Sequence, residues 1–214
     1  MDFYNGQALL EICEKEQMNI SVVMKEREVT MGTLTTEEVD AKLEKVLEIM
    51  RNSSHRPIEK PGKSIGGLIG GEAKLIHDHA ETSQSIAGSM LSKAMAYSMA
   101  VLEVNASMGL IVAAPTAGSS GVLPGILMAL QEEKGLSDEA LYDGLLNASA
   151  VGYILMRNAS VSGAEAGCQA EVGAASAMAA SAIVELMGGT PKQCLAAAVH
   201  ALSLIHISEP TRRR

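Results

Sequence analysis

Apolar residues recur every three or four positions along several stretches of the chain, which is the spacing of one face of an α-helix. The clearest stripe consists of Val39, Leu43, Val46, Leu47 and Met50. Just before it, Thr35 and Glu38 have the spacing of a capping box, in which each side chain satisfies a backbone N–H at the helix start. We therefore predict that a helix begins at Thr35.

Similar spacing predicts further helices, and no stretch alternates apolar and polar residues as a strand would. The expected helices cover residues 6–17, 21–27, 74–107, 122–133, 137–158 and 168–187, with a last one from about 192. Residues 51–71 are rich in Gly, Ser and Pro and are expected to form a connector. The predicted fold is all-α: a single compact helical domain over residues 1–202, with Gly-rich loops forming the site.

The composition favours closely packed helices. Apolar residues make up 47% of the chain but aromatic residues only 2%, and there are 13 Met. Such a core consists mainly of small and flexible side chains, so helix backbones can approach one another closely. Gly173, Ala177 and Ser181 lie four residues apart on one predicted helix face, and we expect that face to contact a neighbouring helix.

Charge and hydropathy limit the possible partners. The formal net charge of −8 argues against nucleic-acid binding, which needs a basic surface. No apolar stretch has the length of a membrane span, and the first residues lack the basic cluster of a signal peptide. We therefore expect a cytoplasmic protein whose three cysteines are reduced. Cys13 and Cys194 are interpreted as small core residues.

Residues 116–121, Thr-Ala-Gly-Ser-Ser-Gly, stand out because they offer hydroxyls and backbone N–H groups without bulky side chains. Such a loop, when it leads into a helix, can hold an anion such as a carboxylate. We take Thr116, Gly118 and Ser119 as candidate substrate-binding residues. An ordinary Gly/Ser connector is the alternative interpretation of this segment taken alone.

Residues 158–173 form the second unusual segment, which is rich in small residues and contains Cys168 after a glycine. A cysteine at a helix start is favoured as the thiolate, the form that binds metal or attacks a substrate. Asn158, at the beginning of the segment, is a further candidate for substrate binding. The alternative is that Cys168 is an inert thiol.

The two segments together resemble a known family. Residues 104–109 with 114–119, and residues 158–160 with 167–173, resemble the signature of the iron–sulfur L-serine dehydratase α chain. Residues 65–71, Ile-Gly-Gly-Leu-Ile-Gly-Gly, resemble its Gly-rich connector. The likeness extends from residue 1 to about Leu202, and both motifs occur in the expected order.

This resemblance implies an L-serine ammonia-lyase that converts L-serine to pyruvate and ammonia in serine degradation. A [4Fe–4S] cluster held by three cysteine thiolates leaves one iron open, and that iron acts as a Lewis acid on the serine hydroxyl. The resemblance makes Cys168 the first cluster ligand and places residues 116–121 beside the cluster. A base must remove the α-proton, and Glu171, Glu165 and His200 are candidates by residue type only.

The chain departs from the family pattern at its end. The later motif that carries the other two cluster cysteines is absent, and residues 203–214 resemble the translation of a foreign sequence. A genuine basic tail is the alternative interpretation of these residues. We expect a C-terminally truncated α subunit that is inactive alone and holds no stable cluster. Since the sequence starts directly with α-type residues, we also expect a separate β chain as its partner.

Two alternatives remain at this point. The chain could be a non-catalytic helical subunit that only packs against a partner, or a related cluster enzyme that acts on another small amino acid such as cysteine. The catalytic hypothesis makes a geometric prediction. Residues 116–121 and 160–168 should lie close together, because both would serve one site.

Overall fold

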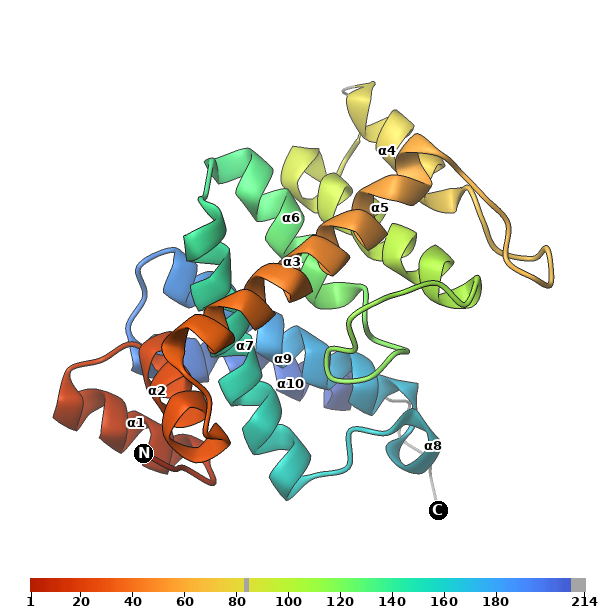
Figure 1. The fold of residues 1–214 in the computed structure, drawn as a ribbon. Coiled ribbons are helices and arrows are strands. Elements are labelled where there is room, and N and C mark those ends of the chain that lie inside the picture. The colour runs from red at the N-terminus through yellow and green to blue at the C-terminus, as the bar shows by residue number, and fades with distance from the viewer. Residues whose placement is uncertain (83–84, 209–214) are drawn as a thin grey trace, which may run out of the picture. The chain divides into compact units, whose positions relative to one another are not determined.

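The computed structural model describes residues 1–82 and 85–208. Within these residues the chain forms helices and no strand, so the predicted all-α fold class is confirmed (Figure 1). None of the described helices is long and apolar enough to cross a membrane. The helices are α1 Gly6–Glu16, α2 Ile20–Gly32, α3 Thr36–Glu59, α4 Glu72–Glu81, α5 Gly88–Ala106, α6 Val122–Lys134, α7 Asp138–Asn158, α8 Gly163–Ala166, α9 Cys168–Leu186 and α10 Pro191–Ser208.

Backbone contacts divide the chain into two compact units. Unit 1 comprises Met1–Val39 and Asp143–Arg214, and unit 2 comprises Asp40–Tyr142. The candidate loop at residues 116–121 therefore belongs to unit 2, whereas Cys168 belongs to unit 1. The predicted foreign tail, residues 203–214, begins within α10, and residues 209–214 lie outside the described part of the chain.

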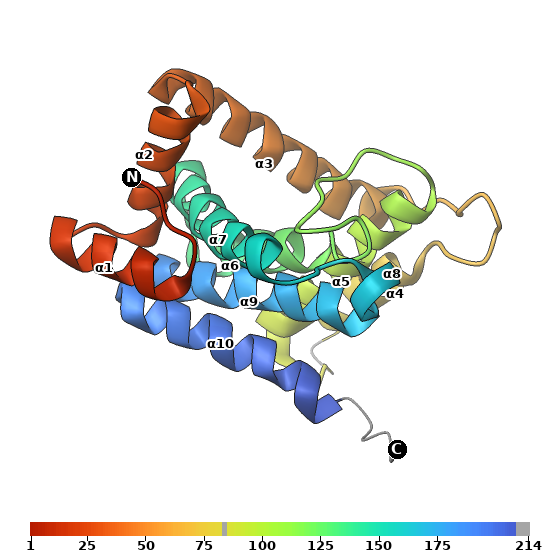
Figure 2. The same ribbon diagram turned by 90° about the horizontal axis from the view of Figure 1, so that it is seen from below.

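In unit 1, α9 and α10 lie side by side (Figures 1 and 2). The predicted contact face of α9 faces the interior, because Gly173, Ala177 and Ser181 are all buried. On the same helix, Met178 packs against Gly152 of α7. Small residues thus allow α9 to be surrounded by other helices of its unit.

The start of α3 has the predicted capping box. The backbone N–H of Thr35 donates to the Glu38 carboxylate at 2.8 Å, and the N–H of Glu38 donates to the Thr35 hydroxyl at 3.2 Å. Val39, Leu47 and Met50 from the predicted stripe are buried. The helix start could therefore be predicted to the residue, because the signal is entirely local.

The end of α3 was predicted wrongly. Residues 51–59, expected to be part of a connector, continue the helix to Glu59. Ser53 and Ser54 are buried, and their hydroxyls donate to the Met50 carbonyl at 3.1 and 2.8 Å, so these polar side chains are satisfied inside the helix. Pro57 lies in the last turns, where its missing N–H removes one bond without ending the helix.

The helix predicted over residues 74–107 is also wrong, because two helices, α4 and α5, occupy this range. Thr82 follows α4, and its hydroxyl donates to the His79 carbonyl at 2.7 Å. Gly88 begins α5 with a φ of 74°, a left-handed conformation that interrupts a right-handed helix. Residues 83–84 of the predicted helix lie outside the described residues.

Two glycines bring α5 and α6 of unit 2 into close contact. A Cβ atom on Gly121 would lie 2.4 Å from the Ser98 carbonyl oxygen. One on Gly125 would lie 2.0 Å from the Ser98 hydroxyl and 2.7 Å from the Ala94 carbonyl oxygen. No other residue type fits these positions without a shift of the helices. The contact fixes the start of α6, and therefore also the end of the loop that precedes it.

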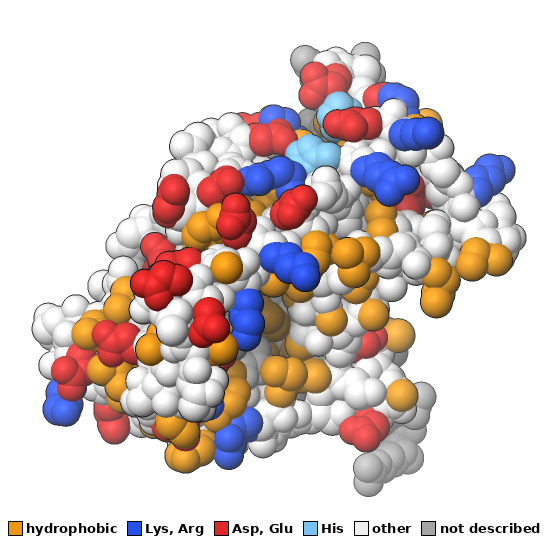
Figure 3. Space-filling model, viewed as in Figure 1, with side chains coloured by type: hydrophobic (Ala, Val, Ile, Leu, Met, Phe, Trp, Pro, Cys, Tyr) orange, Lys and Arg blue, Asp and Glu red, His pale blue; other side chains and the backbone are white. Residues whose placement is uncertain are grey.

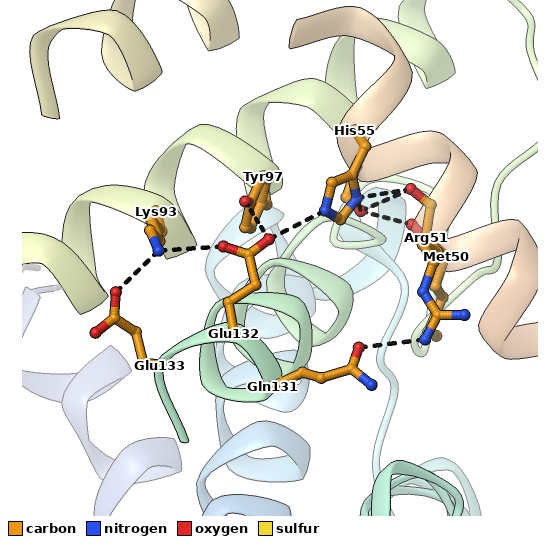
Figure 4. Close-up of polar contacts among 9 residues, drawn as sticks. Met50, Arg51, His55, Lys93, Tyr97, Gln131, Glu132 and Glu133 are labelled. Atoms are coloured by element: carbon orange, nitrogen blue, oxygen red, sulfur yellow. Dashed lines mark hydrogen bonds and ion pairs between the residues drawn. The ribbon is translucent and has the colours of Figure 1, made fainter. Parts of the chain in front are cut away.

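At the other end of α6, Glu132 is the centre of a polar network that joins α3, α5 and α6 (Figure 4). Its carboxylate accepts from the Tyr97 hydroxyl at 2.6 Å and lies 3.2 Å from the Lys93 ammonium group. His55 Nε2 is 3.3 Å from the same carboxylate, and the His55 and Tyr97 rings stack with centroids 4.6 Å apart. Lys93 also pairs with Glu133 at 3.0 Å.

This network makes the stability of the protein depend on pH. Partial burial raises the pKa of Glu132, but hydrogen bonds from Tyr97, Lys93 and His55 outweigh it and hold the pKa below the ordinary value of 4.5. The ionised carboxylate therefore stabilises the fold above the unfolded-state pKa, and this contribution is lost as the pH falls through the folded-state pKa. We expect Glu132→Gln to lose less stability than the wild type between roughly pH 5 and pH 3.

Urea unfolding followed by circular dichroism at each pH measures this difference. Parallel pH profiles for the two proteins would contradict the prediction. Glu48→Gln is the matched control, because Glu48 is an exposed carboxylate of α3 that lies outside the network.

Candidate functional site

Residues 114–121 fold into a compact turn that leads into α6. The Ser119 hydroxyl donates to the Ala114 carbonyl at 3.2 Å and lies 3.1 Å from the Thr116 hydroxyl. The Ser120 hydroxyl donates to the Ala117 carbonyl at 2.8 Å. Ser119 and Ser120 are buried, whereas Gly118 is exposed. The hydroxyls thus shape the turn, and the surface of the loop is mainly backbone near Gly118.

The turn is held from α5 by Asn105. Its side-chain Nδ2 donates to the Ala117 carbonyl at 3.0 Å. Ala117 lies at the exposed tip of the loop, so this bond joins the tip to the last turn of α5. Asn105 belongs to the sequence motif that carried the family resemblance, but its role in holding the loop was not predicted.

In unit 1, residues 159–167 connect α7 to α9. The Ser160 hydroxyl donates to the Glu165 carboxylate at 2.5 Å, and the Ser162 carbonyl accepts the backbone N–H of Ala166 at 2.9 Å. The short helix α8 closes on Gly167, which has a φ of 85°. Gly167 therefore redirects the chain so that Cys168 becomes the first residue of α9.

Cys168 is exposed at this helix start, as its predicted role requires. Cys13 and Cys194 are buried, which agrees with their interpretation as core residues. Burial, together with the charge of Glu185, raises the pKa of Cys13 to about 11 and that of Cys194 to about 12. These two thiols are therefore held in the protonated form, which is a poor metal ligand.

Their position also separates them from Cys168. Both thiols lie close enough to Glu185 to be affected by its charge. Glu185 is at the end of α9, whereas Cys168 is at its beginning. A helix rises about 1.5 Å per residue, so Cys168 and Glu185 are about 25 Å apart. Cys13 and Cys194 cannot join Cys168 around one iron–sulfur cluster in this fold.

Asn158, the last residue of α7, contacts the N-terminal segment. Its Nδ2 donates to the Tyr4 carbonyl at 2.7 Å and to the Ile154 carbonyl at 2.8 Å. Its neighbour Arg157 stacks on the Tyr4 ring, with the guanidinium carbon 4.6 Å from the ring centroid. These contacts fix the end of α7, where the Cys168 loop begins.

The three candidate bases have different surroundings. Glu171 is one turn after Cys168 on α9, and its carboxylate packs on Gly163, where a Cβ atom would lie 2.5 Å from an oxygen. Glu165 is exposed and bonded to Ser160. His200 is exposed on α10, and its Nδ1 lies 2.7 Å from the Ala196 carbonyl oxygen. Of these, Glu171 is the one that shares a helix face with Cys168.

Glu185 is a polar residue of structural importance that was not predicted. Its carboxylate accepts the backbone N–H groups of Ile20 at 3.1 Å and Ser21 at 3.2 Å, and so caps the start of α2. It also accepts from the buried Asn147 side chain at 2.7 Å. The sequence signal was a charged residue near the end of a helix, residues 168–187, whose only other charge is Glu171 in the first turn. Its partners are too distant in sequence to be deduced from that signal.

The family resemblance implies a [4Fe–4S] cluster, which needs at least three thiolate ligands. Cys168 fits the role of one ligand, because it is exposed and follows a glycine turn at a helix start. Among the described side chains, which are those of residues 1–82 and 85–203, no group of three or more His, Cys, Asp or Glu is placed to hold a metal ion. The described residues thus fit one ligand of such a cluster and do not complete its ligand set.

Comparison with known proteins agrees with the motifs. Residues 15–206 match the family "Serine dehydratase alpha chain". An L-serine dehydratase alpha chain from Peptoniphilus asaccharolyticus is 39% identical over 202 residues, covering 94% of this chain and 68% of the relative. A probable L-serine dehydratase alpha chain from Bacillus subtilis is 41% identical over 191 residues, covering 89% and 63%.

A longer relative is similar over the same region. L-serine dehydratase TdcG from Escherichia coli is 31% identical over 208 residues, covering 94% of this chain and 45% of the relative. The chain thus spans about two thirds of the two alpha chains and less than half of the Escherichia coli protein. The matched region includes α2 to α9 with both candidate loops. The chain belongs to the serine dehydratase alpha chain family.

Proposed function

We propose that the protein containing this chain is an L-serine ammonia-lyase, which converts L-serine to pyruvate and ammonia. The observation that carries the proposal is the family match over residues 15–206, which includes both candidate loops. Relatives over the same region are named L-serine dehydratase, which is a lyase activity.

We propose that residues 116–121 bind the substrate carboxylate. The loop leads directly into α6, and the positive end of a helix dipole favours an anion there. Gly118 leaves the exposed backbone without a side chain, while the Thr116 and Ser119 hydroxyls hold the turn in shape. We also propose Asn158 as a substrate-binding residue. It lies at the end of α7, where the segment that carries Cys168 begins.

We further propose that Cys168 is one ligand of a [4Fe–4S] cluster that serves as a Lewis acid. The exposure of its thiol at the start of α9 supports this role. The described residues supply one suitable thiolate, so this proposal requires further ligands from residues other than those described. Glu171, on the next turn of the same helix, is the base candidate whose position is most consistent with action beside Cys168.

The direct test is the reaction of the complete α chain with its partner, reconstituted with iron and sulfide without oxygen. We expect pyruvate and ammonia in equal amounts from L-serine. Hydrogen sulfide and pyruvate from L-cysteine at a higher kcat/KM would instead support the related enzyme for another amino acid. A reconstituted, iron-loaded protein without either activity would support the non-catalytic subunit and refute the proposal.

We propose a separate β-type chain as the partner. Two relatives are named alpha chains, whereas the Escherichia coli relative is a longer protein that is not so named. Four large apolar side chains on two loops of unit 2 are more than 70% exposed: Ile65 (82%), Leu68 (90%), Met108 (82%) and Leu110 (71%). Figure 3 shows hydrophobic side chains on the projecting connector between α3 and α4. Exposed apolar side chains of this kind mark interaction surfaces.

Replacing Leu68 with Asp should therefore weaken association with the β-type chain by about tenfold or more, because burying a charge in an apolar interface is unfavourable. Met31→Asp provides the matched control, since Met31 is an exposed apolar residue of unit 1. Isothermal titration of the two chains measures both affinities. Equal affinities for wild type and Leu68→Asp would exclude the connector from the interface.

A further inference from the structure

The last turn of α5 contacts the loop at residues 116–121 and the start of α4, where the Gly-rich connector ends. Asn105 donates from Nδ2 to the Ala117 carbonyl at 3.0 Å, in the loop at residues 116–121. Two residues earlier, the Glu103 carboxylate accepts the backbone N–H of Ala73 at 2.8 Å, in the first turn of α4 directly after the Gly-rich connector. One turn of helix thus holds two segments that are distant in sequence.

This turn is itself fixed by backbone hydrogen bonds. The N–H of Ser107 donates to the Glu103 carbonyl at 3.1 Å, and the N–H of Gly109 donates to the Val104 carbonyl at 2.9 Å. A Cβ atom on Gly109 would lie 2.6 Å from the Val104 side chain, so the chain turns back tightly on the helix end. The side chain of Asn105 therefore projects from a firmly held backbone.

In the loop at residues 116–121, Asn105 donates to a carbonyl that also accepts a hydrogen bond from within the loop. The Ala117 carbonyl accepts from Asn105 and from the Ser120 hydroxyl, at 3.0 and 2.8 Å. The backbone N–H of Ser120 also donates to this oxygen, at 3.4 Å, and the three donors together fix the plane of the peptide between Ala117 and Gly118. The orientation of this peptide sets the direction of the exposed backbone that follows it.

At the start of α4, the Glu103 carboxylate takes the place of an N-cap side chain. The N-cap residue of α4 is Gly71, which has no side chain to accept the first N–H groups. Glu103 is only 4% exposed, and its carboxylate satisfies the N–H of Ala73 where the helix dipole favours negative charge. The end of the connector is therefore held against α5 by a buried acceptor.

We infer that Asn105 and Glu103 are positioning residues for substrate binding, and that through them the connector at residues 60–71 and the loop at residues 116–121 act as one binding surface. This inference rests on the proposed function. Neither side chain needs to touch the substrate. Asn105 orients the peptide that precedes Gly118, and Glu103 keeps the connector in place beside the same helix end.

The test uses the complete, cluster-loaded enzyme with its partner. Asn105→Ala should raise the KM for L-serine by about tenfold or more, the effect of losing one well-placed hydrogen bond, and leave kcat nearly unchanged. Asn52→Ala is the matched control, because Asn52 is an exposed asparagine on α3. Glu103→Leu should also raise KM, whereas Glu103→Gln, which keeps an acceptor, should restore a value near that of the wild type.

Hydrogen exchange gives a second measurement that does not depend on activity. The amides of residues 118–121 should exchange faster in Asn105→Ala, and those of the first turn of α4 faster in Glu103→Leu, with the rest of the chain unchanged. Unchanged KM and exchange in both variants would overturn the inference, as would a fall in kcat with general loss of protection. If the wild type does not deaminate L-serine, the proposed function fails, and exchange alone decides whether Asn105 and Glu103 hold the two segments.

Discussion

Cys168→Ser in the complete enzyme is expected to remove the cluster and reduce serine deamination to background. The thiol lies exposed at the start of α9, and a serine hydroxyl does not ionise near neutral pH to replace a thiolate ligand. Iron and sulfide content and the visible absorption of the cluster measure the first effect, and pyruvate formation measures the second. Both should be lost while the circular dichroism of the helices remains.

Cys13→Ala and Cys194→Ala are the matched controls for this experiment. Both thiols are buried near Glu185, at the other end of α9, so their loss should leave iron content and activity in place. A Cys168→Ser enzyme with full iron content would refute the assignment of Cys168. Loss of iron in Cys13→Ala without loss of helical structure would show that a buried thiol reaches the cluster.

Gly125→Val is expected to produce the largest loss of stability. Even a Cβ atom at this position would lie 2.0 Å from the Ser98 hydroxyl and 2.7 Å from the Ala94 carbonyl oxygen. The second of these atoms belongs to the backbone of α5 and cannot rotate away, so the two helices must separate. We expect a loss of about 3 kcal/mol or more in the free energy of unfolding, as for severe overpacking.

Gly152→Ala is the control for Gly125→Val, because it also adds a side chain to a glycine inside a helix. Its Cβ atom would meet only the flexible end of Met178, at 3.0 Å from Cε. The free energy of unfolding should change by no more than about 1 kcal/mol, since the better helix propensity of alanine offsets the contact. Equal losses in the two variants, measured by urea unfolding, would contradict the account of the α5–α6 contact.

Local signals predicted several parts of this fold correctly. The capping box at Thr35 and Glu38 and the buried face at Gly173, Ala177 and Ser181 depend on residues within one or two helical turns. The exposed Cys168 at a helix start could be predicted for the same reason, because a glycine and a following apolar helix mark the position.

The features that were missed depend on distant contacts. The network around Glu132 joins three helices, and no spacing within α6 indicates that Tyr97 and His55 face this carboxylate. Likewise, Ser53 and Ser54 are typical of a connector until their burial in α3 is known. Asn105 was recognised as part of a motif, but its bond to Ala117 depends on how the chain turns after α5.

The prediction from the sequence that residues 116–121 and Cys168 serve one site stays a prediction, because the two segments belong to different units of the chain. A distance between two spin labels tests it directly. Cys168 is the exposed cysteine and Cys13 and Cys194 are buried, so a nitroxide reagent should label Cys168 selectively, and Ala117→Cys adds a second exposed position. Pulsed electron resonance on the doubly labelled protein should give a distance well below about 30 Å, the width of a small domain. A distance of about 30 Å or more would place the two loops on different sides of the protein and would contradict a shared serine-deaminating site.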